Sequence, residues 1–116
     1  MKQAASFFKV LADEARLKML WLLFNQKELC VCDFMAVLEI TQSKASRHLR
    51  TLYKAGLVTD RRAGQWGYYS LRPAEDFLTR ECLETLRTAF TSNAEAVGLL
   101  KKLAVWLEKK SEAGCR

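Results

Sequence analysis

Two cysteines separated by one residue are the part of this sequence best suited to chemistry. Cys30 and Cys32 lie in the run Leu29-Cys-Val-Cys-Asp33, and Cys82 and Cys115 follow. Charged residues interrupt the first fifteen positions, so no export signal is predicted and the thiols are expected to be reduced. Metal binding or thiol chemistry is then favoured over structural disulfides. Alone the motif is weak, because cysteine is often simply a small buried apolar residue.

The one-residue spacing also constrains the backbone. Residues two apart on a regular helix point about 200° from each other, because each residue turns the chain by about 100°. Both sulfurs can therefore bind one ion only if the backbone around Val31 is non-helical or becomes so. We expect ion binding to distort the start of the helix that follows the pair.

A second functional segment covers residues 41–56. Ala45, Leu49 and Leu52 form one apolar helical stripe, Thr41 is a candidate N-cap, and Gly56 suits the helix end. The outward faces carry no acid, and arginine or lysine there can pair with phosphates while glutamine or arginine reads base edges. The predicted DNA contacts on this helix are Gln42, Ser43, Lys44, Ser46, Arg47, His48 and Arg50.

The charge of the chain is concentrated around this helix. Residues 41–72 hold seven basic residues against the single acid Asp60, so this segment carries the whole formal net charge of +6. A localised positive surface on an otherwise neutral chain indicates a polyanionic partner. Double-stranded DNA is favoured over a membrane, because the apolar face of the helix is needed for the core.

The surrounding elements form a recognisable order. The sequence predicts a helix over residues 3–12 and a central core helix over residues 14–26 that is capped by Asp13. A short helical face within residues 29–38 and a turn at 39–41 precede the basic helix, which gives a helix-turn-helix. Two β-prone runs, 57–62 and 68–71, then form a hairpin, or wing. Its Arg61, Arg62 and Gln65 are placed to reach flanking phosphates or the minor groove.

Two helices are expected to end the chain, over about residues 74–90 and 93–110, with Ser92 and Glu95 forming a capping box between them. Their apolar surface exceeds what a small core requires, which favours a homodimer. The predicted fold is mainly α with a β-hairpin wing: one winged helix-turn-helix domain over residues 1–116 that dimerises through its N- and C-terminal helices, the latter at about 74–110. With 50% hydrophobic residues and no span long enough for a bilayer, a folded cytoplasmic protein without a membrane partner is expected.

These residues resemble the ArsR/SmtB family of bacterial dimeric metal-sensing repressors. The resemblance rests on the cysteine run, on Thr41-Gln-Ser-Lys-Ala-Ser-Arg-His-Leu49, and on the segments 55–58 and 61–66, all in the family's order. It implies a winged-helix dimer that covers operator DNA, an imperfect inverted repeat, until a metal ion or metalloid binds. The cysteine run is most similar to that of the arsenite-responsive members.

Two departures from the family pattern bear on the ligands. Arsenite sensors of this type often have a third cysteine where this chain has Met35. The zinc and cobalt sensors place aspartate and histidine ligands on the last helix, whereas the only histidine here is His48. A zinc site on the terminal helices is therefore not expected. The third ligand beside Cys30 and Cys32 stays open between Cys115, Cys82, a small thiol and water.

Arsenic(III) and antimony(III) are soft centres that select thiolates, so the resemblance implies one of them as inducer, without an organic cofactor. Two alternatives use the same cysteines: a cadmium- or lead-responsive repressor, and a thiol-redox-sensing repressor. An enzyme is not predicted, because no nucleophile–histidine–acid set, phosphate loop or Cys-x-x-Cys pair is present.

Overall fold

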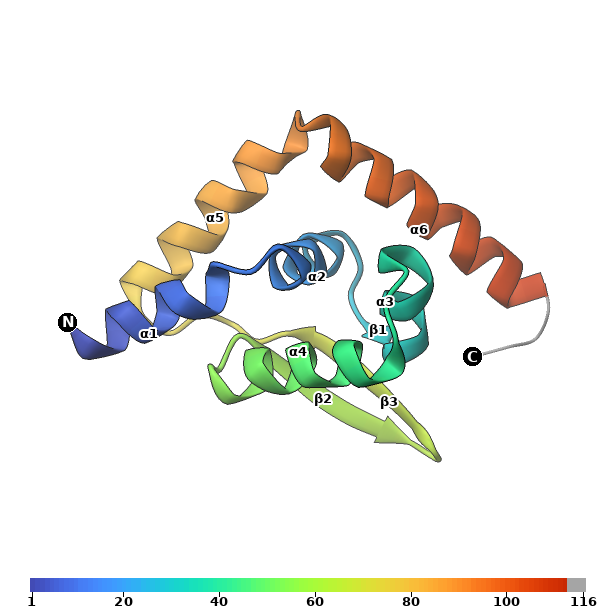
Figure 1. The fold of residues 1–116 in the computed structure, drawn as a ribbon, viewed down its shortest axis with the longest axis horizontal. Helices are drawn as coiled ribbons and strands as arrows, with labels where there is room; N and C mark the ends of the chain where they lie inside the picture. Colours follow the sequence, from blue (N-terminus) through green and yellow to red (C-terminus); the bar gives the residue numbers. More distant parts are fainter. Residues whose placement is uncertain (113–116) are drawn as a thin grey trace.

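The computed structural model describes residues 1–112. Its elements are α1 (Lys2–Leu11), α2 (Glu14–Asn25), β1 (Leu29–Cys30), α3 (Val31–Leu38), α4 (Gln42–Lys54), β2 (Val58–Ala63), β3 (Trp66–Leu71), α5 (Phe77–Thr91) and α6 (Ala94–Glu112). Helices α5 and α6 meet at an apex and arch over α2 and α3, while α4 and the β2–β3 hairpin lie on the opposite side (Figure 1). The mainly helical, winged helix-turn-helix architecture is confirmed.

The core is built around α2, as predicted. Met19, Leu20 and Leu22 on this helix are completely buried, and the stripe of Ala45, Leu49 and Leu52 from α4 is equally inaccessible. Burial of side chains of this size contributes about 1.5–3 kcal/mol each. The basic helix is therefore fixed to the core by one face, which leaves its other faces at the surface.

Three predicted helix ends are also confirmed: the start of α2 and both ends of α4. The Asp13 carboxylate accepts from the Arg16 amide at 3.1 Å, and the Thr41 hydroxyl accepts from the Lys44 amide at 3.2 Å. Gly56 follows α4 with a φ of +78°, a conformation that a residue with a Cβ adopts at a cost. These local interactions set where α2 begins and where α4 begins and ends.

Residues 29–38 differ from the single helical face that the sequence predicted. Leu29 and Cys30 form the short strand β1, which pairs antiparallel with Tyr69 and Tyr68 of β3, and the helix begins only at Val31. The sheet therefore has three strands in the order β1-β3-β2, not the two of a bare hairpin. Cys30, the residue before α3, is thus paired directly with the wing strand β3.

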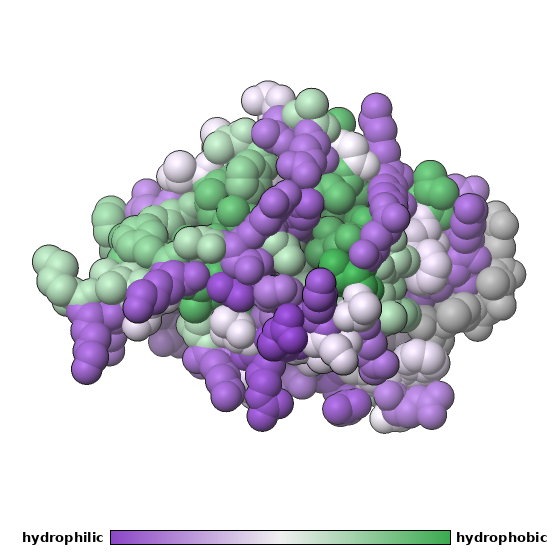
Figure 2. Space-filling view, in the orientation of Figure 1, coloured by the Kyte–Doolittle hydropathy of each residue, from purple (hydrophilic) through white to green (hydrophobic). Residues whose placement is uncertain are grey.

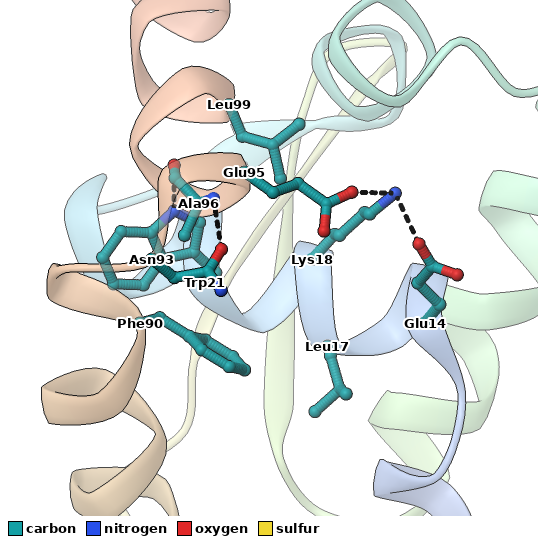
Figure 3. Close-up of a pocket in the computed structure, with 9 residues that line it drawn as sticks. All are labelled: Glu14, Leu17, Lys18, Trp21, Phe90, Asn93, Glu95, Ala96 and Leu99. Atoms are coloured by element: carbon teal, nitrogen blue, oxygen red, sulfur yellow. Dashed lines mark hydrogen bonds and ion pairs between the residues drawn. The ribbon is translucent and has the colours of Figure 1, made fainter.

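The corner between α5 and α6 is anchored on α2. The Trp21 indole donates from Nε1 to the Ala96 carbonyl at 2.8 Å, and Lys18 bridges Glu14 and Glu95 at 3.1 and 3.3 Å (Figure 3). The predicted Ser92 capping box is wrong: the cap is Asn93, whose side-chain oxygen accepts from the Ala96 amide at 2.9 Å. Helix α6 packs on α2 and α3 and uses much of its apolar face within the same chain.

None of the helices within residues 1–112 combines the length and the apolar character needed to cross a membrane.

Candidate functional site

Residues 29–35 form the cysteine box, and its two cysteines converge at the junction of β1 and α3. Cys30 is the N-cap residue of α3 and has an extended backbone, with φ −95° and ψ 169°, so the helical divergence of alternate side chains does not apply to it. The Cys30 and Cys32 sulfurs lie 2.8 Å apart, and neither is part of a disulfide. The non-helical backbone that both sulfurs need in order to bind one ion is therefore already present at Cys30.

Asp33 completes this cluster, although no role was predicted for it from the sequence. Its side chain is only 2% exposed. One carboxylate oxygen accepts from the Cys30 amide at 2.8 Å, and the other accepts from Trp106 Nε1 at 2.8 Å and from Lys110 Nζ at 2.7 Å. A buried carboxylate needs such partners, because its desolvation is otherwise very costly. Asp33 thereby fastens α6 to the cysteine box.

The Cys32 thiol is held in its neutral form by this environment. Burial, followed by the hydrogen bond with Cys30, raises the pKa of the Cys32 thiol to about 12. Lys110 Nζ lies 3.4 Å from the Cys30 sulfur. Burial alone would lower the pKa of Lys110, but the hydrogen bond and charge of Asp33 outweigh it and raise that pKa, so the ammonium remains charged.

A cavity of about 420 Å³ lies beside the sulfurs and connects the box to the other functional elements. Its lining comes from three sources: Cys30, Cys32 and Met35 of the box, Gln42 and Ser46 at the start of α4, and Arg62, Gln65 and Trp66 of the wing. A ligand on the two sulfurs would therefore border residues that were predicted to contact DNA.

The predicted DNA contacts on α4 lie largely where the sequence placed them. One exposed face contains Gln42, Ser43, Lys44, Ser46, Arg47 and Arg50. Hydrophilic side chains project from the lower side of the molecule, where α4 and the hairpin lie (Figure 2). Six of the seven predicted contacts on the helix are thus available to a polyanion.

His48 is the exception, because it is less exposed than the other six and has partners within the chain. Its side chain is only 14% exposed, and Nδ1 lies 3.2 Å from the Arg16 guanidinium and 3.9 Å from the Asp13 carboxylate. Burial lowers the pKa of His48, so the neutral ring accepts a hydrogen bond from Arg16. His48 therefore packs α4 against the start of α2 and does not belong to the exposed face.

In the wing, Arg62 and Gln65 are exposed, while Arg61 has an intramolecular partner. Arg61 Nε donates to the Glu28 carboxylate at 2.9 Å, and its guanidinium lies 4.7 Å from the centre of the Tyr68 ring. Glu28 precedes β1, so this ion pair is a second connection between the cysteine box and the wing. Sequence reasoning missed it, because 33 positions separate the partners.

The structure does not bring Cys82 to the site. Cys82 is half-buried on α5 and lines an apolar groove against α1, together with Phe8, Leu11 and Leu86. Within residues 1–112, the only group of three or more histidine, cysteine and acidic residues arranged to hold a metal ion is Cys30, Cys32 and Asp33. Cys115, the other suggested third ligand, lies outside the described residues.

Comparison with known proteins agrees with these features. The family model described as bacterial regulatory protein, arsR family, matches residues 13–60. The chain is 52% identical over 66 residues to the arsenic resistance transcriptional regulator ArsR1 of Pseudomonas putida, covering 57% of this chain and 52% of ArsR1. The chain thus spans about half the length of that relative.

Two further relatives extend the comparison. ArsR2 of the same organism, also an arsenic resistance transcriptional regulator, is 44% identical over 77 residues, covering 66% of this chain and 67% of ArsR2. The cadmium resistance regulatory protein CadC of Listeria innocua is 38% identical over 68 residues, covering 59% of this chain and 57% of CadC.

Solved structures agree with both the fold and the family. Reduced HlyU from Vibrio cholerae has a TM-score of 0.67 at 31% identity, covering 78% of this chain and 92% of HlyU. The homodimeric winged helix-turn-helix DNA-binding domain Mb0332 from Mycobacterium bovis has a TM-score of 0.61 at 29% identity, covering 81% of this chain and 80% of Mb0332. The chain therefore belongs to the arsR family of bacterial regulatory proteins.

Proposed function

We propose that this protein is a metal(loid)-responsive repressor that binds operator DNA as a dimer and leaves it when arsenite or antimonite binds Cys30 and Cys32. The observation that carries the proposal is the convergence of two thiols on a cavity shared with α4 and the wing. The likeness to arsenic resistance regulators supports the same inducer class. A repressor of this kind acts in the cytoplasm, where we place the protein.

The chemistry suits a thiophilic metalloid. Arsenous acid and two thiols condense to form two As–S bonds, and each thiol proton leaves with one arsenic hydroxide as water. Soft thiolates are the preferred ligands of such a centre. Because no proton has to be released into solution, a Cys32 thiol that is protonated at neutral pH does not oppose the reaction. A remaining hydroxide or a small thiol supplies the third position on arsenic.

The coupling to DNA follows from where the two sulfurs are attached. Thiolates that share one ion at bond lengths of about 2.3 Å, as around zinc, lie farther apart than the 2.8 Å between these sulfurs. Binding would therefore move apart the sulfur of Cys30, a residue of the wing sheet, and the sulfur of Cys32, a residue of α3. A ligand that favours the separated arrangement shifts the protein away from its DNA-binding form.

Dimerisation has a candidate surface on α1 and α5. The apolar groove between these helices is bordered by Phe8, and hydrophobic surface extends over this region on the left of the molecule (Figure 2). Two copies related by a dyad would place their α4 helices in successive major grooves about 34 Å apart. Selection from random duplexes should therefore return an imperfect inverted repeat.

Phe8→Glu should convert the dimer into a monomer. The Phe8 side chain is 49% exposed in the single chain and would be buried in the proposed interface, where an unpaired carboxylate is costly. Light scattering at micromolar concentration should report twice the chain mass of 13.3 kDa for the wild type and a single chain mass for the variant. Val105→Glu on α6 is the matched control at a similarly exposed apolar residue, and it should remain dimeric because α6 packs much of its apolar face against its own chain. A monomeric wild type would refute the dimer.

Arg62→Ala in the wing should weaken binding to all DNA sequences about equally and lower the slope of log affinity against log salt by about 1, because one phosphate contact is lost. Fluorescence anisotropy over a series of salt concentrations measures both quantities. Lys101→Ala, an exposed lysine on α6, should change neither. An unchanged slope for Arg62→Ala would show that the wing does not contact the backbone in this way.

One observation also favours a second candidate, the thiol-redox-sensing repressor. The two sulfurs are already in contact at 2.8 Å, so an oxidant could join them without bringing distant residues together. Mass spectrometry after peroxide treatment separates the two functions. A redox sensor would lose two protons per chain and leave DNA, whereas an arsenite sensor keeps its response under reducing conditions.

A further inference from the structure

Asp33 is a third metal-ligand side chain in the dithiol cluster, and its availability decides which ions the site can hold. The ligand atoms of Cys30, Cys32 and Asp33 all lie within 4.8 Å of one another. Two thiolates and one carboxylate form a set that suits divalent cations such as zinc and cadmium. Arsenic(III) gains little from the hard carboxylate oxygen.

Both oxygens of this carboxylate already accept hydrogen bonds within the chain. One oxygen holds the Cys30 amide, and the other holds both Trp106 Nε1 and Lys110 Nζ. The Lys110 side chain is only 13% exposed, so its charge is screened weakly by solvent. Its ammonium is also 3.4 Å from the Cys30 sulfur. A cation would have to displace Lys110 from Asp33 or accept a buried positive charge beside it.

We propose that Lys110, with Trp106, determines the specificity of the site by withholding Asp33 from the ion. The site then accepts a neutral metalloid hydroxide through two sulfurs and disfavours divalent cations. Arsenous acid brings no charge and releases two water molecules as its As–S bonds form. A divalent cation brings two positive charges toward the ammonium and expels two thiol protons to solvent. The inference rests on the proposed arsenite function and names the residues that select for it.

Lys110→Met tests this assignment directly. Cadmium and arsenite binding are measured by equilibrium titration of the DNA-free protein under reducing conditions. We expect cadmium affinity to rise by at least about tenfold, because residues that hydrogen-bond to metal ligands typically change metal affinity on this scale. Arsenite affinity should change by less than about threefold. Lys110→Arg, which keeps the charge and donors, and Lys109→Met, which removes a neighbouring exposed lysine, should behave like the wild type.

Two further variants distinguish the effect of the Lys110 charge from the effect of its hydrogen bond to Asp33. Lys110→Gln removes the charge but keeps a donor for Asp33, so its gain for cadmium should be smaller than that of Lys110→Met. Adding Asp33→Asn to Lys110→Met should abolish the gain, because the carboxylate is then no longer present. Circular dichroism establishes that each variant is folded.

Unchanged cadmium affinity in folded Lys110→Met would overturn the inference, as would a gain that survives Asp33→Asn. A wild-type protein that fails to bind arsenite would refute the proposed function instead. The cadmium comparison does not depend on DNA or on arsenite, so these two failures are distinguishable.

Discussion

Arsenite should release the wild-type protein from its operator and should fail to release either Cys30→Ser or Cys32→Ser. Each substitution replaces a soft thiolate by a hard hydroxyl and leaves one sulfur, which cannot chelate. Loss of the second, intramolecular attachment lowers apparent affinity by about 10²–10⁴-fold. The arsenite concentration for half-release, followed by anisotropy of labelled operator DNA, should rise by at least about 10²-fold on this basis.

Both serine variants should still fold and bind DNA, because neither cysteine is itself part of the exposed face of α4 and serine differs from cysteine by one atom. Serine is a favoured N-cap residue, so Cys30→Ser keeps the start of α3. Cys82→Ser is the matched control and should respond like the wild type, since Cys82 lies in the α1–α5 groove. Cys115→Ser tests the remaining candidate for a third protein sulfur. If both box variants kept a normal response, the sensing site would lie elsewhere.

Arg47→Ala should weaken operator binding by about 1–3 kcal/mol and relax specificity at one base position, because Arg47 is exposed near the start of α4 and has the donors to read a base edge. The loss should be larger on the operator than on a scrambled duplex of the same length. Lys101→Ala on α6 removes a charge of the same sign away from this face and should bind both duplexes normally. Equal losses on both duplexes for Arg47→Ala would assign Arg47 to the phosphate backbone instead.

The structural features that the sequence predicted correctly are set by local interactions. Asp13 and Thr41 cap the amides three residues ahead, and Gly56 takes the left-handed conformation that ends α4. The Ser92 error is of the same kind. Ser92 and Asn93 are adjacent residues that can both cap a helix, and only the packing of α6 on Trp21 and its neighbours selects Asn93.

The placement of His48 could have been predicted more closely. His48 is three residues after Ala45 and next to Leu49, so a helix that buries these two residues turns position 48 partly inward. The partners of His48, Arg16 and Asp13, are on another helix and leave no local signal.

The remaining site features depend on tertiary contacts that no local pattern encodes. Strand β1 has only two residues and exists because Leu29 and Cys30 pair with β3. Asp33 meets Trp106 and Lys110 across 73 and 77 positions of sequence. The sequence therefore predicted that the cysteines lie at the start of the helix-turn-helix. The convergence of their sulfurs and the link from Asp33 to α6 could be seen only in the three-dimensional structure.

The most direct test of the arsenite-sensing function is a titration of the wild-type protein on operator DNA under reducing conditions, with arsenite, antimonite, cadmium and lead in parallel. We expect arsenite and antimonite to release the DNA at lower concentrations than cadmium or lead, and Cys82→Ser to match the wild type. A protein that stays on DNA in saturating arsenite but leaves it with cadmium, lead or an oxidant would contradict the assignment.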